Sequence, residues 1–163
     1  MFVAAGRVHL LYGLAGSGKT TLARALCAEG QAVRFTLDEW MIRLYPGLSF
    51  ETAEYGRRTE IIKDLIWSVA EQVLRSGTDV VLDWNSWSRT RRAWAVQRAA
   101  AIPAEVILHC LDASVEQATA RVGLRSRDPR SVYAHVIGRE GNEHLASIME
   151  PPSEAEGFGI ASD

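Results

Sequence analysis

The chain has 163 residues, of which 47% are hydrophobic and 23% are charged, a balance typical of a single globular domain with one core. Its formal net charge is −2, so no overall positive charge attracts nucleic acid or an anionic membrane surface. No cationic start with a long apolar run opens the chain, and no apolar segment is long enough to span a bilayer. These features predict a cytoplasmic protein whose expected partners include no membrane, and for which nucleic acid is disfavoured.

Apolar runs and helical patterns alternate from the start of the chain. The run at Arg7–Tyr12 is typical of a buried parallel strand and ends at Gly13. Ser49 is expected to cap a long helix that ends near Ser76. The first four predicted elements are a strand, a helix, a strand and a short helix, at Arg7–Tyr12, Gly18–Ala28, Gln31–Leu37 and Asp38–Tyr45.

The second half of the chain continues this alternation. Strands are expected at Asp79–Leu82, Glu105–Leu111 and Phe158–Ala161, and helices at Ser88–Ala101, Ala113–Arg127 and Ser131–Met149. Alternating strands and helices predict an α/β fold with a parallel sheet and helices on both faces. No repeat, linker or low-complexity tract divides the chain, so we expect one domain over residues 1–163.

Glycine and aspartate residues follow the predicted strands at the points where ligands bind in open parallel sheets. They are Gly13, Asp38, Asp83 and Asp112. We therefore expect these four residues to converge on one edge of the sheet.

The segment Gly13–Thr20 (GLAGSGKT) matches the P-loop pattern GxxxxGK[ST]. Its glycines allow backbone N–H groups to turn toward a β-phosphate, and the following helix directs its positive end at the same anion. Lys19 is expected to reach the β- and γ-phosphates, and the Thr20 hydroxyl to bind Mg²⁺. The predicted ligand is a nucleoside triphosphate, as Mg·ATP, bound by Gly13, Ala15, Gly16, Ser17, Gly18, Lys19, Thr20 and Thr21.

Asp38 is the candidate general base, because a carboxylate after the second strand faces the γ-phosphate across the cleft. The alternative is that Asp38 only caps the short helix that it begins. Glu39 is a neighbouring candidate that would project differently. Trp40 and Arg43 lie on the same short helix, where they could form a substrate-pocket wall and an anion contact, or simply pack.

Asp83 ends an apolar strand, as the aspartate of a Walker B strand does, and is the second candidate Mg²⁺ ligand. Trp84 and Trp87 follow it and could form a platform for the substrate, although core packing is the simpler reading for Trp87. Arg91 could face the same cleft from the next helix, whereas Arg89 and Arg92 could equally be solvated.

Arg121 and Arg125 are four residues apart, so they share one face of the predicted helix that leads to Asp128-Pro129. Arginines at a helix end before a break suit a lid that closes over phosphates, which we expect around residues 121–135. One of them could neutralise charge on the transferring phosphoryl group. A solvated cationic face is the alternative.

With these motifs placed, the chain resembles the small P-loop kinases of the AAA_33 group, which neighbours chloramphenicol phosphotransferase, zeta toxins, gluconate kinase and polynucleotide kinase. The motifs that carry the resemblance are YGLAGSGKTTLARAL, FTLDEW, VVLDWNSWSRTRR, ILHCLDAS, ARVGLR and EPPSEAEG. Together they cover nearly the whole chain. The resemblance implies a P-loop NTPase fold of the nucleoside-monophosphate-kinase type with a small lid.

The same resemblance implies roles for individual residues. It assigns the general base to Asp38 and the lid arginine to Arg125, with Arg121 beside it, and places Pro151 and Pro152 near the adenine. Relatives commonly read D-[FY]-G-x-W where this chain has DWNSW at Asp83–Trp87, so substrate contacts there do not transfer.

Three functions fit these motifs. The first is an ATP-dependent kinase that phosphorylates a hydroxyl of a metabolite, nucleoside, sugar or antibiotic. The second is an NTP-binding ATPase or switch without phosphotransfer, although no NKxD guanine motif occurs and Trp84 stands where motors usually carry a second acid. The third is a 5′-polynucleotide kinase, which the net charge and the lack of a basic stripe disfavour.

Overall fold

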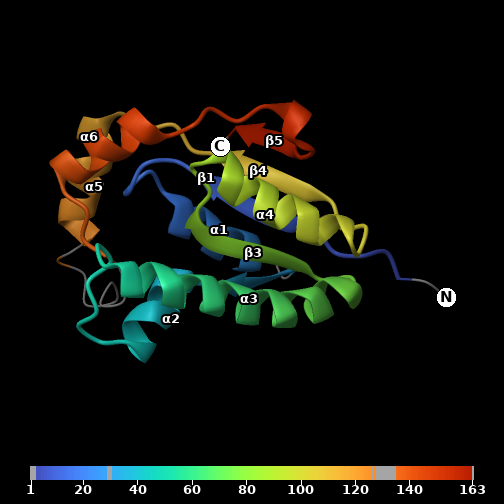
Figure 1. Ribbon diagram of the computed structural model, residues 1–163. Coiled ribbons are helices and arrows are strands. Elements are labelled where there is room, and N and C mark those ends of the chain that lie inside the picture. Colours follow the sequence, from blue (N-terminus) through green and yellow to red (C-terminus); the bar gives the residue numbers. More distant parts are fainter. Residues whose placement is uncertain (1–2, 29–30, 126, 128–134, 163) are drawn as a thin grey trace.

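A parallel five-stranded sheet forms the centre of the molecule (Figure 1). The computed structural model describes residues 3–28, 31–125, 127 and 135–162. In the order β2-β3-β1-β4-β5, all neighbouring strands are parallel. The strands are β1 (Val8–Tyr12), β2 (Ala32–Phe35), β3 (Asp79–Asn85), β4 (Val106–Cys110) and β5 (Gly159–Ser162).

Helices cover both faces of this sheet, as alternation predicts. Figure 1 shows α5 and α6 packed together beyond one end of it. The described helices are α1 (Lys19–Ala28), α2 (Leu37–Leu44), α3 (Ala53–Arg75), α4 (Arg89–Ala100), α5 (Val115–Arg125), α6 (Arg139–Ile148) and the short 3₁₀ helix η2 (Glu154–Glu156). Among these helices, none is long and apolar enough to cross a membrane.

Successive residues of the strands pack against different helices, because side chains alternate across a sheet. Leu10 and Leu82 belong to a large core cluster with residues of α2, α3 and α4. Leu11 and Val81 form a smaller cluster with Ala23 of α1. The two clusters place α1 on one face of the sheet and the other three helices on the opposite face.

Two helix starts differ from the sequence prediction. The cap of α3 is Thr52, whose side chain accepts the N–H of Tyr55, and Ser49 instead accepts the N–H of Glu51 in the preceding turn. The cap position of α2 is Thr36, so Asp38 lies within the first turn rather than at the cap. The alternative that Asp38 only caps this helix is therefore wrong.

Other bounds also differ from the sequence prediction. Strand β3 continues to Asn85, three residues beyond the predicted end, so that Asp83 and Trp84 lie within a buried strand. Helix α5 ends at Arg125, and α6 begins only at Arg139. The lid that we predict around residues 121–135 falls largely on residues 126 and 128–134, which lie outside the described residues.

Candidate nucleotide-binding and phosphate-transfer site

The P-loop joins β1 to α1, with the glycine-rich turn at the carboxyl edge of the sheet. Gly16 has a φ of 87°, which favours glycine. A Cβ atom at this position would also lie 2.2 Å from the carbonyl oxygen of Ala118 on α5. The turn therefore packs directly on α5, and any side chain at Gly16 would disturb it.

Two further residues define the walls of this loop. The side chain of Asn85 on β3 donates a hydrogen bond of 2.8 Å to the Gly13 carbonyl oxygen. The Ser17 hydroxyl is buried and has no hydrogen-bond partner among the described residues. Because buried hydroxyl groups normally have a partner, this oxygen is suited to a ligand contact inside the loop. Thr21, in the first turn of α1, is exposed.

Lys19 folds back over the loop that precedes it. Its Nζ atom donates to the carbonyl oxygens of Gly13 and Leu14, at 2.9 and 2.6 Å. Burial is the main reason that the pKa of Lys19 is lowered to about 8; Arg125 also acts to lower it, while the nearby carboxylates of Asp83 and Asp38 act to raise it. An anion placed in the loop would replace the two carbonyl groups as partner and restore the charge.

Asp83 lies beside the first helical turn after the loop. Its carboxylate oxygens lie 3.3 and 3.4 Å from the Thr20 hydroxyl. Arg34 on β2 contacts one of them, Oδ2, through Nε at 2.8 Å and Nη2 at 2.7 Å. The sequence analysis did not identify Arg34, which became visible only when β2 and β3 were seen to be adjacent.

The donor set at Thr20 and Asp83 fits a magnesium ion. Mg²⁺ accepts oxygen ligands and is usually bound by one or two protein groups together with phosphates and water. A hydroxyl and a carboxylate lie side by side here, and Arg34 donates its hydrogen bond to Asp83 Oδ2 rather than to Oδ1. No group of three His, Cys, Asp or Glu residues that could hold a metal by itself occurs in the described part of the chain.

Asp38 lies in the first turn of α2, where its carboxylate is close to the charged groups of the loop. Its pKa is raised, chiefly because the surrounding protein removes water from the carboxylate, with a further contribution from Asp83. His135, Lys19 and Arg91 act in the opposite direction. The structure thus brings Asp38, the predicted base, together with Lys19 and Asp83 in one electrostatic cluster.

An aromatic group borders Asp38 that the sequence analysis missed. The Tyr55 hydroxyl lies 2.8 Å from Nε2 of His135, and the Phe50 ring centroid lies 5.2 Å from that of the same histidine. Burial raises the pKa of Tyr55 to about 12, and Asp38 adds to the increase. These residues join α3 to the segment before α6, a pairing that no local pattern indicates.

The predicted substrate residues differ in their surroundings. Trp84 is 6% exposed and packs edge-on against Trp94, so its side chain forms part of the core rather than an open platform. Trp40 packs edge-on against Phe35. Arg43 is exposed on α2 and lies 3.4 Å from Glu39.

Trp87 is half-buried and Arg91 is exposed, and both follow the end of β3. The guanidinium of Arg91 lies 5.3 Å from the centre of the Trp87 ring and donates to the Asn85 carbonyl oxygen over 3.2 Å. Burial lowers the pKa of Arg91, whereas Glu60 and Asp38 raise it. Within the described residues, no carboxylate lies within ion-pair distance of this guanidinium.

The two arginines of α5 occupy different positions. Arg125 is half-buried, close enough to affect Lys19, and lies 3.5 Å from the His135 carbonyl oxygen. Arg121, one turn earlier, is exposed. Of the pair, Arg125 is therefore the one that stands next to the loop.

Arg92 fixes the C-terminal tail, contrary to the sequence analysis, which left it as a possible solvated residue. Its side chain is fully buried and pairs with both carboxylate oxygens of Glu156, at 2.9 and 3.1 Å. It also donates to the carbonyl oxygens of Ser86 and Glu150. The tail that includes the exposed Pro151 is thereby held against the start of α4, near the end of β3.

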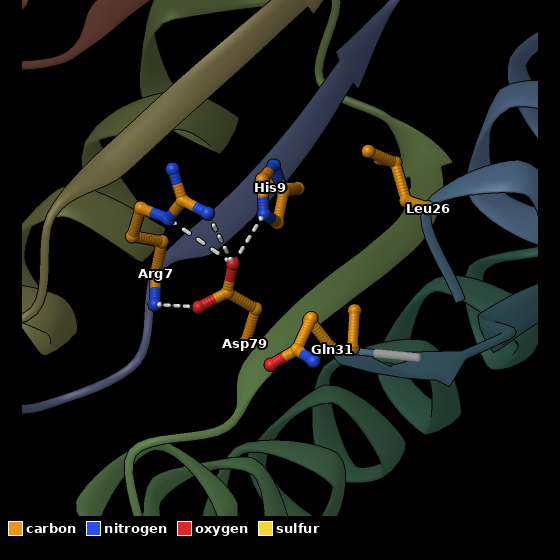
Figure 2. A pocket seen from close by; sticks show the side chains of 6 residues that line it. Arg7, His9, Leu26, Gln31 and Asp79 are labelled. Carbon is orange, nitrogen blue, oxygen red and sulfur yellow. Dashed lines mark hydrogen bonds and ion pairs between the residues drawn. The ribbon is translucent and has the colours of Figure 1, made fainter. Parts of the chain in front are cut away.

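A separate hollow of about 190 Å³ lies at the opposite edge of the sheet (Figure 2). Figure 2 shows Arg7 and His9 both directed at Asp79, the first residue of β3, with distances of 3.1 Å to the same carboxylate oxygen. Nδ1 of His9 lies 2.9 Å from Nε2 of His109. The hollow is lined from the amino ends of β1, β2 and β3, so it is distinct from the P-loop site at their carboxyl ends.

Comparison with solved structures supports the fold. An APS kinase from Mycobacterium tuberculosis, in complex with AMPPNP and APS, has 23% identity and a TM-score of 0.61, with 97% of this chain and 88% of that chain covered. Kti12 from Chaetomium thermophilum, in complex with ADP-AlF3, has 20% identity and a TM-score of 0.66, with 95% and 88% covered.

A gluconokinase from Sinorhizobium meliloti has 13% identity and a TM-score of 0.54, with 98% of this chain and 83% of that chain covered. No curated protein matches the sequence. The model of the AAA_33 family, described as an AAA domain, matches residues 8–150 and thus spans the P-loop, β3, α5 and α6. Nucleotide binding is implied by this P-loop family, and the chain belongs to it: the protein is a member of the AAA_33 family.

Proposed function

We propose that the protein is an ATP-dependent kinase that transfers the γ-phosphate to a hydroxyl group of a small-molecule acceptor. The observation that carries this proposal is the electrostatic cluster of Asp38, Lys19 and Asp83 at the carboxyl edge of the sheet. A P-loop that only binds or hydrolyses nucleotide does not need a carboxylate of raised pKa beside its lysine. Complexes of similar fold contain AMPPNP or ADP-AlF3, which supports ATP as the donor.

In this reaction, each residue of the cluster has a defined task. The N–H groups of the loop and Lys19 hold the β- and γ-phosphates, and Arg125 balances charge on the transferring group. Asp38 accepts the proton of the acceptor hydroxyl. The hydroxyl oxygen bonds to the γ-phosphorus, and the bond between the γ-phosphorus and the β-phosphate oxygen breaks. ADP and a phosphate ester are the products. A magnesium ion held at Thr20 and Asp83 would supply positive charge to the phosphate oxygens.

The acceptor would bind between α2, the start of α3 and the end of β3. Residues that would contact it are Arg91 and His135, which both interact electrostatically with Asp38, together with their partners Trp87 and Tyr55. Trp40, Arg43 and Trp84 would contribute as supporting walls rather than as direct contacts, and Pro151 near the adenine remains a prediction.

The test is an acceptor screen with γ-labelled ATP, followed by kinetics of Asp38→Asn. We expect phosphotransfer to fall by about 100-fold or more. ATP affinity should be retained, because the substitution removes a negative charge near the γ-phosphate. Glu39→Gln, one residue away on α2, is the matched control and should transfer at the wild-type rate. ATP turnover without any acceptor, unchanged in Asp38→Asn, would instead indicate an ATPase or switch.

A further inference from the structure

Asn142, on α6, makes a two-point contact with the P-loop. Its Oδ1 atom accepts a hydrogen bond from the N–H of Ala15, and its Nδ2 atom donates one to the carbonyl oxygen of the same residue, both at a distance of 3.0 Å. The residue is 0% exposed. Nδ2 also lies 3.4 Å from the hydroxyl of Thr119 on α5. An amide is the side chain that supplies one acceptor and one donor in this arrangement.

This contact fixes the backbone of the third loop residue from outside the loop. With its N–H and carbonyl groups both bound by Asn142, Ala15 is held in one orientation. The next residue, Gly16, lies against the Ala118 carbonyl of α5. Two consecutive residues of the loop are thus held from outside it, Ala15 by α6 and Gly16 by α5.

We propose that Asn142 is a positioning residue of the nucleotide site, which holds the P-loop in its phosphate-binding conformation and joins it to the α5–α6 pair. A preformed loop binds more tightly because less backbone freedom is lost on binding. Arg125 lies on α5, so the contact between Asn142 and Ala15 also sets the distance between Arg125 and Lys19. This inference rests on the proposed nucleotide binding, but it does not depend on the identity of the acceptor.

The test compares Asn142→Ala with Thr119→Val. Both variants weaken the packing of α5 against α6, but only Asn142→Ala releases Ala15. Isothermal titration with Mg·ADP should show an affinity about tenfold lower for Asn142→Ala and within about twofold of wild type for Thr119→Val. Amide exchange, followed by NMR without nucleotide, should be faster at Ala15 in Asn142→Ala only. The exchange measurement requires no activity.

Asn142→Asp covers the case in which the alanine variant does not fold. Aspartate has the same shape and can accept the Ala15 N–H, but it turns an oxygen toward the Ala15 carbonyl and adds a negative charge beside the phosphates. Its Mg·ADP affinity should fall at least as far as that of the alanine variant. Wild-type affinity in either folded variant, or slow Ala15 exchange in Asn142→Ala, would overturn the proposal. A wild-type protein that binds no nucleotide would refute the proposed function instead.

Discussion

Lys19 should bind a proton when nucleotide binds. Burial lowers its pKa to about 8 in the nucleotide-free protein, whereas phosphate groups beside the ammonium favour the charged form. About half of the molecules therefore carry neutral Lys19 at pH 8, and about nine-tenths do at pH 9. Binding should take up about 0.1 proton at pH 7, about 0.5 at pH 8 and about 0.9 at pH 9. If only the charged form binds, affinity falls about tenfold from pH 7 to pH 9.

The proton uptake can be measured by titration calorimetry with Mg·ADP in two buffers of different ionisation enthalpy. The nucleotide contributes little at pH 8 and above, because the second pKa of a phosphate group is about 6. Lys19→Arg is the control. Arginine stays protonated at these pH values, so the proton uptake should vanish even if the variant binds Mg·ADP more weakly. Uptake that does not change with pH, or that persists in Lys19→Arg, would refute the assignment of Lys19 as the phosphate-binding cation.

Three further predictions concern other parts of the fold. Arg92→Met should lower the free energy of unfolding by about 3–5 kcal/mol in urea titrations, because it removes a buried cation and leaves the Glu156 carboxylate without it; the exposed Arg89→Met should change it by less than about 0.5 kcal/mol. Arg34→Leu should lower the Mg²⁺ concentration needed for half-maximal nucleotide binding by about tenfold, because Arg34 is a cation on the same carboxylate; a higher requirement would mean that Arg34 orients Asp83 for the metal. Burial lowers the pKa of His9, and the hydrogen bond to Asp79 opposes this. The unfolded chain therefore binds the proton more readily, and the free energy of unfolding should fall as the pH drops below about 6.5. An equal fall in the free energy of unfolding of His9→Asn over the same pH range would contradict this.

The elements of the fold were predictable because their signals are local. An apolar run such as Val8–Tyr12, or the glycine pattern of Gly13–Thr20, determines its own conformation. Helix starts were less certain, since Thr52 and Ser49 are both competent caps and only packing decides between them. The predicted end of β3 was wrong because a charged residue, Asp83, follows its apolar run. In the structure the strand continues through Asp83, where Arg34 of the neighbouring strand pairs with its carboxylate.

Residues that act through distant partners carried no such signal. Arg92 is 64 positions from Glu156, and nothing around either residue in the sequence indicates that they meet. The pairing of Tyr55 with His135 spans 80 positions. Asn142 lies in a polar helix without any recognisable motif, 127 positions from Ala15. Such contacts depend on how α3, α4 and α6 are placed around the sheet, which local patterns do not specify.

The P-loop illustrates what a motif leaves undetermined. Its glycines permit the phosphate-binding turn, but they also permit many other turns, because glycine adopts most backbone conformations. The selection of one turn comes from outside the motif: Asn85 binds the carbonyl of Gly13, and Asn142 binds both backbone groups of Ala15. Chains that share GLAGSGKT but lack these amides should therefore hold the loop less rigidly, and differ in nucleotide affinity without any change in the residues that touch the phosphates.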